Sequence, residues 1–431
     1  MEKLERWKES PRRKPLVIHG ARQVGKTWLL KEFGRTKFRN VAYVTFDNNP
    51  VMAALFESGY DTKSILLGLQ AEAGEAITEG ETLVIFDEVQ ECPKALTSLK
   101  YFHENMSNLH IAAAGSLLGL TLHSGTGFPV GNVTTLELYP LSFDEFLDAT
   151  GNGPLRELLL SDKVEAISAL APKAILLLRQ YYYVGGMPSA VMAFIEEGQL
   201  KAARDEQLQI LTDYRLDISK HVPAAEVERI LAVWDSIPRH LGKENKKFIF
   251  GQIREGARAR DYRSAITWLS QAGLVTLVNR VSKPGMPLAA YADEGAFKLF
   301  VLDVGLLGAM SGLRERAVIE GDDVFTEFKG SLTEQHVCQQ LLSSCGLRPF
   351  YWASDTTKNE IDFVVQDEEG TFPIEAKAEE NLRSKSLRAF AGKYPETHPL
   401  RFSMAGFRVE PWMRNVPLYA LSNVGLWKAS L

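Results

Sequence analysis

One short segment limits the possible folds of this chain more than any other. The residues GARQVGKT, from Gly20 to Thr27, follow an apolar run and match the pattern GxxxxGK(S/T). Such a loop works between a buried strand and a helix, because its backbone N–H groups and the helix amino terminus surround phosphate oxygens together. The sequence therefore predicts an α/β domain of the P-loop type.

The pattern assigns a task to each of its fixed residues. Gly20 and Gly25 let the backbone curl around phosphate, Lys26 neutralises the β- and γ-phosphates, and Thr27 is a ligand for Mg²⁺. The other residues expected to contact the nucleotide are Ala21, Arg22, Gln23, Val24 and Trp28. The expected ligands are ATP and Mg²⁺.

A second motif, TLVIFDE, ends an apolar strand with two acids. Asp87 is expected to hold Mg²⁺, and Glu88 to orient or deprotonate the attacking water. A carboxylate next to the metal-binding acid favours hydrolysis over phosphoryl transfer to another substrate. Ser116 ends a third apolar run, where it could sense the γ-phosphate or equally cap a helix. Lys26 and Glu88 are thus the predicted catalytic residues of an ATPase, and no feature identifies an arginine finger.

The chain has 431 residues, which predicts several domains. Strand-like and helix-like runs alternate from 15 to 140, which indicates a mostly parallel sheet and a P-loop domain over 1–150. Helix-rich sequence at 151–223 predicts a lid. Three helical runs (226–238, 248–259 and 261–273) then precede two strand-like runs (274–281 and 287–292), and this order predicts a winged helix over 224–320.

A local positive charge lies in the predicted winged helix. Residues 239–263 hold eight Lys or Arg against three Asp or Glu, a net +5, whereas the whole chain carries −5. Phosphate contacts of DNA need such a surface. The candidate contacts are Arg258, Arg260 and Arg263 around the third helix, Lys243, Lys246 and Lys247 before it, and Lys283 in the hairpin. The alternative is a solvated basic face that packs against the acidic remainder.

The final segment, 321–431, contains EIDFVVQ and FPIEAKA. Glu375 and Lys377 alternate along a strand, so both project to one face, and a hairpin would bring Asp362 beside them. Asp362, Glu375 and Glu334 are the expected metal ligands, and Lys377 is the expected catalytic residue. The alternative is a small α/β domain with a salt-bridged Glu–Lys pair.

The motifs together resemble a known family. GARQVGKT, the acidic pair, AGSLLG, FPVGNV, LYPLSFDEFL, YYYVGGMPSAV and the terminal IEAK are similar to those of a prokaryotic AAA-type ATPase family with a carboxyl-terminal PD-(D/E)XK nuclease-like domain. The resemblance covers nearly the whole chain. It implies a restriction-endonuclease-like fold at 321–431, with Asp362, Glu375 and Lys377 at the positions of that family's motif.

The composition limits the class of protein and the cellular compartment that we expect. The chain is 45% hydrophobic and 24% charged, has no apolar run of about 18 residues, and its three cysteines form no CxxC pair. We therefore expect a cytoplasmic protein without membrane segments that hydrolyses ATP and binds or processes DNA. The alternatives are a nucleotide-dependent switch or DNA-binding regulator with a silent nuclease-like domain, and a protein-remodelling ATPase that binds no nucleic acid. A homo-oligomer could supply the missing arginine.

Overall fold

The computed structural model describes residues 1–116, 128–243, 246–315, 323–378 and 384–428, with the backbone alone at 323–327. Contacts divide the chain into two compact units. The first contains Met1–Tyr139 and Gln271–Gly273, and the second contains Pro140–Ser270 and Leu274–Leu431. Apart from Gln271–Gly273, the segments predicted as lid, winged helix and nuclease-like domain therefore lie in one unit.

The first unit is built on a five-stranded sheet in the order β2-β3-β4-β1-β5, and every pairing is parallel. Its strands are β1 (Leu16–His19), β2 (Asn40–Thr45), β3 (Thr82–Asp87), β4 (His110–Ala114) and β5 (Thr134–Glu137). Its helices are α1 (Glu2–Glu9), α2 (Lys26–Lys37), α3 (Pro50–Glu57), α4 (Thr62–Ala73) and α5 (Pro93–Asn105), with a short 3₁₀ turn at Val89–Glu91. The predicted α/β fold with a parallel sheet is confirmed.

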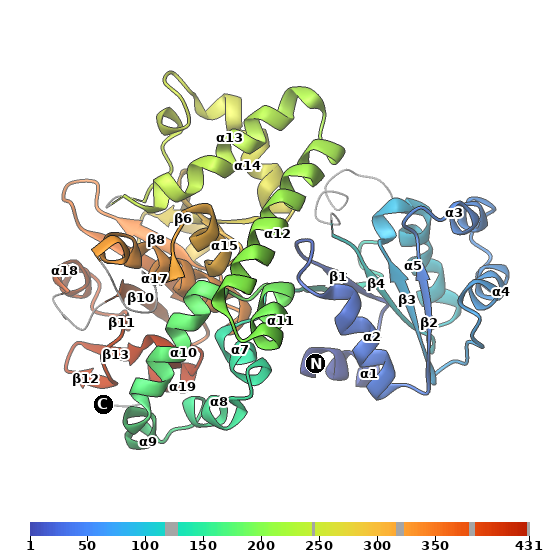
Figure 1. The fold of residues 1–431 in the computed structure, drawn as a ribbon, viewed down its shortest axis with the longest axis horizontal. Helices are drawn as coiled ribbons and strands as arrows, with labels where there is room; N and C mark the ends of the chain where they lie inside the picture. Colours follow the sequence, from blue (N-terminus) through green and yellow to red (C-terminus); the bar gives the residue numbers. More distant parts are fainter. Residues whose placement is uncertain (117–127, 244–245, 316–322, 379–383, 429–431) are drawn as a thin grey trace. The chain divides into compact units, whose positions relative to one another are not determined.

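Helices cover both faces of this sheet, and its central strands β1, β3 and β4 are buried along nearly their whole length. On β3, Leu83 and Ile85 face one core and Val84 and Phe86 face the other. Helices α1 and α2 pack on the first face, and α3, α4 and α5 on the second (Figure 1). A strand that is buried on both faces has a nearly continuous run of apolar residues, as LVIF in β3 does.

Helices make up the first part of the second unit. They are α7 (Phe143–Ala149), α8 (Gly153–Leu159), α9 (Val164–Ala169), α10 (Ala171–Val184), α11 (Pro188–Glu197), α12 (Leu200–His221), α13 (Ala224–Leu241) and α14 (Ala259–Gln271). Later helices are α15 (Val304–Met310), α17 (Asp323–Ser343), α18 (Lys385–Lys393) and α19 (Val424–Lys428). None of the helices in the described ranges has both the length and the apolar character needed to cross a membrane.

An eight-stranded mixed sheet forms the other part, in the order β12-β13-β11-β10-β9-β8-β6-β7. The strands are β6 (Val275–Val281), β7 (Ala292–Val301), β8 (Phe350–Ala353), β9 (Glu360–Gln366), β10 (Thr371–Lys377), β11 (Leu400–Ser403), β12 (Arg408–Glu410) and β13 (Met413–Pro417). As predicted, β9 and β10 are antiparallel neighbours.

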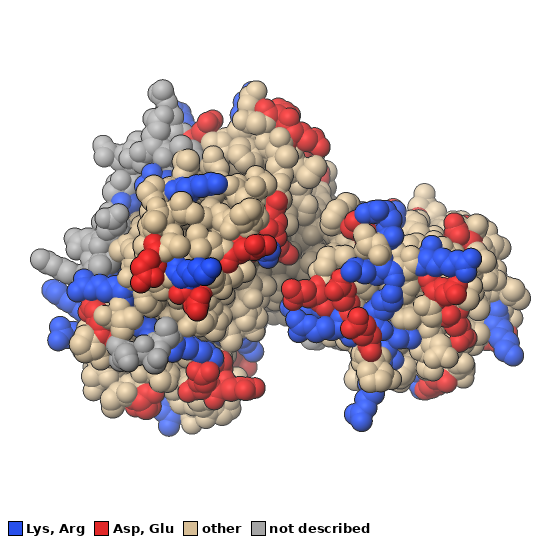
Figure 2. All heavy atoms as spheres, turned by 90° about the horizontal axis from the view of Figure 1, so that it is seen from below, with Lys and Arg blue, Asp and Glu red and all other residues tan. Residues whose placement is uncertain are grey.

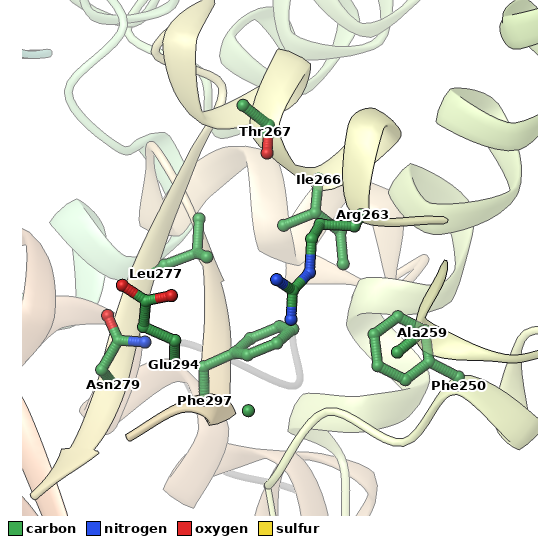
Figure 3. A pocket seen from close by; sticks show the side chains of 10 residues that line it. Phe250, Ala259, Arg263, Ile266, Thr267, Leu277, Asn279, Glu294 and Phe297 are labelled. Atoms are coloured by element: carbon green, nitrogen blue, oxygen red, sulfur yellow. The ribbon is translucent and has the colours of Figure 1, made fainter. Parts of the chain in front are cut away.

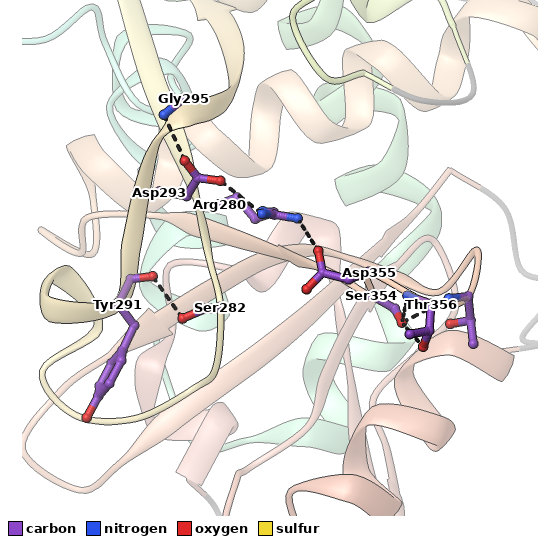
Figure 4. A network of polar contacts seen from close by, with 9 residues as sticks. Arg280, Ser282, Tyr291, Asp293, Gly295, Ser354, Asp355 and Thr356 are labelled. Carbon is purple, nitrogen blue, oxygen red and sulfur yellow. Dashed lines mark hydrogen bonds and ion pairs between the residues drawn. The ribbon is translucent and has the colours of Figure 1, made fainter.

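The hairpin β6–β7 belongs to this sheet, so the structure does not confirm a separate winged-helix domain. Strand β6 pairs in parallel with β8, which follows it by about seventy residues, through Arg280 opposite Tyr351. The Arg280 guanidinium also bonds Asp293 of β7 at 2.9 Å and Asp355 after β8 at 2.8 Å (Figure 4). These charge-assisted contacts join the hairpin to the carboxyl-terminal strands.

Two expected elements in this region are absent from their predicted places. The run 248–259 holds only a 3₁₀ turn at Phe250–Gln252 within its described residues, and Gly256 adopts a positive φ that interrupts a helix. The second hairpin strand is Ala292–Val301, whereas Leu288–Tyr291 is a 3₁₀ turn. The run at 296–301, apolar except for Lys298, is fully buried and supplies the inner part of the strand instead.

The family-like motifs LYPLSFDEFL and GGMPSAV form a buried hydrogen-bonded junction. The amide of Leu141 donates to the carbonyl of Gly186, and the amide of Gly186 donates to the Asp303 carboxylate at 2.6 Å. The Tyr181 hydroxyl donates to the carbonyl of Leu141 at 2.6 Å. A Cβ on Gly186 would lie 2.0 Å from that carbonyl oxygen, so glycine is required by packing.

Candidate functional site

The predicted phosphate loop joins β1 to α2 at the carboxyl edge of the parallel sheet, where ligands of such folds bind. Gly20 and Gly25 have φ values of 146° and 91°, which favour glycine, and Gln23 is also left-handed at 64°. A Cβ on Gly20 would lie 2.2 Å from the carbonyl oxygen of Leu138. The loop therefore has a backbone path that ordinary residues could not follow at Gly20.

Lys26 lies at the first turn of α2 and is 6% exposed. Its ammonium donates to the carbonyl oxygens of Gly20 at 3.0 Å and Ala21 at 2.6 Å. Burial lowers the Lys26 pKa to about 8, although the charges of Glu88 and Asp87 oppose the shift. The cation is thus held at the loop by weak carbonyl partners that a phosphate could replace.

The acidic pair meets the loop from the end of β3. The Thr27 hydroxyl donates to the two carboxylate oxygens of Asp87 at 3.0 and 2.9 Å, and Asp87 is buried. Glu88 follows with φ at 50°, a conformation that a non-glycine residue rarely adopts. A carboxylate and a hydroxyl within contact distance form the kind of oxygen donor set that suits Mg²⁺.

Two further residues of this site were not predicted. The Tyr43 hydroxyl, on β2, donates to Asp87 at 2.8 Å, and the Gln90 amide donates to the Glu88 carboxylate. Tyr43 holds the acid from the neighbouring strand, so only the strand order brings it there. The sequence did contain one indication: Tyr43 lies between Ala42 and Val44 in VAYVTFD, so it projects to the opposite face of the strand from these two buried residues.

The remaining predicted loop contacts differ in exposure. Ala21 and Val24 are buried, and Trp28 is 69% exposed directly after Thr27. Ser116 is buried just beyond the end of β4. The part of AGSLLG that follows it, 117–119, lies outside the described residues.

The predicted DNA contacts divide into exposed and buried groups. Arg258 and Arg260 are exposed near the start of α14, whereas Lys246 is buried and paired with Glu334. Figure 3 shows Arg263 directed toward Phe297 in a pocket of about 260 Å³. On the face in Figure 2, Lys and Arg side chains lie among Asp and Glu. Lys246 was therefore wrongly placed among the surface residues.

The predicted residues of the second site share one charged cluster, which we call the carboxylate cluster: Glu334, Glu360, Asp362 and Glu375 with Lys246, Lys298 and Lys377. The Asp362 carboxylate accepts the amide of Ala376 at 2.9 Å, and Lys377 pairs with Glu375 at 3.0 Å. Lys298 was not predicted. In the described part of the chain, no three His, Cys, Asp or Glu side chains are grouped so that they could hold a metal ion.

Burial dominates the electrostatics of this cluster. Burial and the charge of Glu334 raise the Asp362 pKa to about 7. Burial alone would raise the Glu334 pKa, but Lys246 and Lys298 lower it below its ordinary value. The lysines therefore stabilise the charged form of Glu334.

Comparison with known proteins agrees with the geometry of the first unit. Residues 12–147 match the family model described as an AAA domain. This match supports the predicted P-loop domain in that part of the chain. Residues 175–317 match a domain of unknown function, DUF8612, and residues 329–426 match another, DUF4143. These matches do not confirm a nuclease-like fold.

Solved structures are similar only distantly. A Walker-type ATPase of Pyrococcus abyssi is 15% identical, with a TM-score of 0.45 over 72% of this chain and 95% of that one. The Aeropyrum pernix ORC1 protein in complex with DNA is 14% identical, with a TM-score of 0.25 over 72% and 90%. Cdc6p from Pyrobaculum aerophilum is 14% identical, with a TM-score of 0.24 over 74% and 91%. No curated protein matches the chain.

Proposed function

We propose that the AAA domain binds ATP and hydrolyses it with Mg²⁺. The observation that carries this proposal is the contact of Thr27 with Asp87, because it joins the phosphate loop to the acidic strand at one point. Bound Mg²⁺ would supply positive charge to the β- and γ-phosphates. Thr27 and Asp87 are the residues that would hold it.

The other residues act on the triphosphate and the water. Lys26 exchanges its two carbonyl partners for phosphate oxygens and neutralises charge as it develops. Glu88, oriented by Gln90, accepts the proton of the attacking water. The left-handed φ of Glu88 costs about 1–3 kcal/mol, and such strain concentrates at functional sites.

Steady-state hydrolysis by purified variants tests the proposal. Lys26→Ala should lose turnover, and Glu88→Gln should still bind ATP while losing roughly 10²-fold or more in kcat. Lys37→Ala removes the same charge from the other end of α2, where it pairs with Glu5, and should hydrolyse ATP like the wild type. Unchanged hydrolysis by Lys26→Ala would remove the enzyme assignment.

DNA binding is a second candidate, favoured by the exposed Arg258 and Arg260 near the start of α14. Affinity for duplex DNA should fall as salt rises, with a log–log slope near −0.9 for each neutralised phosphate. Replacing both arginines by alanine should reduce the magnitude of that slope by up to about 1.8. Fluorescence anisotropy measures it, with Arg6→Ala on α1 as the exposed control. No binding at low salt would favour the protein-remodelling alternative.

A further inference from the structure

Lys298 is the least expected member of the carboxylate cluster. It lies on β7 opposite Val278 of β6, and its side chain is 1% exposed. Lysine is almost never fully buried unless it is paired. Its ammonium lies 2.5 Å from Glu360 and 3.7 Å from Glu334. The fold therefore holds the Lys298 charge in the protein interior, where the carboxylates of Glu360 and Glu334 compensate it.

A second lysine reaches the same carboxylate from another segment. Lys246 pairs with the other oxygen of Glu334, and both side chains are about nine-tenths buried. Glu334 therefore accepts a hydrogen bond from Lys246 on one carboxylate oxygen, and the Lys298 ammonium lies 3.7 Å from the other. The two lysines come from the segment that matches DUF8612, whereas all four carboxylates come from 329–426.

We propose that Lys298, together with Lys246, takes the place of a divalent cation in the carboxylate cluster, so that this cluster binds neither Mg²⁺ nor Mn²⁺. A metal ion ligated by Glu334 would have to approach two ammonium groups in a water-poor interior, where like charges repel strongly. Hard cations prefer oxygen ligands, and here two ammonium groups supply the positive charge instead, Lys298 at 2.5 Å from Glu360 and Lys246 paired with Glu334.

The β6–β7 ladder fixes the backbone position of Lys298, and the strand continues into the buried Leu299. Burial would lower the Lys298 pKa, but the charges of Glu334, Glu360 and Asp362 outweigh burial and raise it.

Mn²⁺ binding, followed by electron paramagnetic resonance of the free ion, tests the proposal. All proteins carry Asp87→Asn, so that the acidic pair of the AAA domain does not add a site. The parent should show no Mn²⁺ binding at the cluster, whereas Lys298→Met should bind Mn²⁺ with an affinity at least roughly tenfold above the detection limit set by the parent. Adding Glu334→Gln to Lys298→Met should remove the gain. Lys385→Met, on the exposed side of α18, should behave like the parent.

A second readout protects the test against a misfolded variant. Mn²⁺ should raise the melting temperature of Lys298→Met and leave that of the parent unchanged. If Lys298→Met does not fold, Lys246→Met is measured instead and should gain binding in the same direction. Mn²⁺ binding by the parent that Glu375→Gln abolishes, or folded lysine variants without any gain, would overturn the proposal. Neither result depends on ATP hydrolysis, so the proposed function stands or falls separately.

Discussion

At the scale of single residues, Asp87 receives two different kinds of support. Thr27 belongs to the phosphate-loop pattern, so its contact with Asp87 was expected from the motif. Tyr43 belongs to no motif and reaches Asp87 only because β2 lies beside β3. The same difference separates Lys377, which the sequence placed beside Glu375, from Lys298, which it did not.

Lys26 should make nucleotide affinity depend on pH. Burial lowers its pKa to about 8, so the free protein loses this positive charge as pH rises through about 8. Phosphate binds the charged form, and metal-free ATP should therefore bind roughly tenfold or more weakly at pH 9.5 than at pH 7.5. Titration with a fluorescent ATP analogue measures this. Lys26→Ala should bind weakly with little pH dependence, and a flat wild-type profile would contradict the expectation.

At the scale of elements, apolar runs predicted strands well wherever the strand is buried on both faces. Strands β1, β3 and β4 are of this kind and were found in their expected places. The hairpin was harder, because local pattern shows that β6 is a strand but not which strand borders it. Its neighbour β8 is about seventy residues away, and the pairing depends on Arg280 and on burial that no short window contains.

The glycine motif gives a prediction at this scale. Gly186→Ala would place a methyl group 2.0 Å from the carbonyl oxygen of Leu141, where backbone atoms cannot easily move. We expect a loss of roughly 2–4 kcal/mol in the free energy of unfolding, measured by urea denaturation. Gly392→Ala, in an open position on α18, should instead be neutral or gain about 0.5–1 kcal/mol. Equal stability of the two variants would contradict the packing role of the motif.

At the scale of the whole molecule, the shared sheet predicts which fragments fold. Residues 140–431 contain all eight strands, whereas 321–431 lacks β6 and β7 and leaves Glu334 without Lys246 and Lys298. Unpaired buried charge and an open strand edge both destabilise a fragment. The longer fragment should show one cooperative thermal transition by near-UV circular dichroism, and the shorter fragment should show none. A cooperative transition of 321–431 at the same temperature would contradict this expectation.

The pairing of β6 with β8 also has a consequence for the evolution of the chain. Two regions that match separate family models contribute adjoining strands and opposite charges to one interior. Replacing either region alone by recombination would separate the β6–β7 hairpin from β8, with which β6 pairs. It would also separate Lys246 and Lys298 from Glu334. We therefore expect homologous proteins to keep the two regions together. Substitutions at Lys298 and Glu334 should be correlated among them.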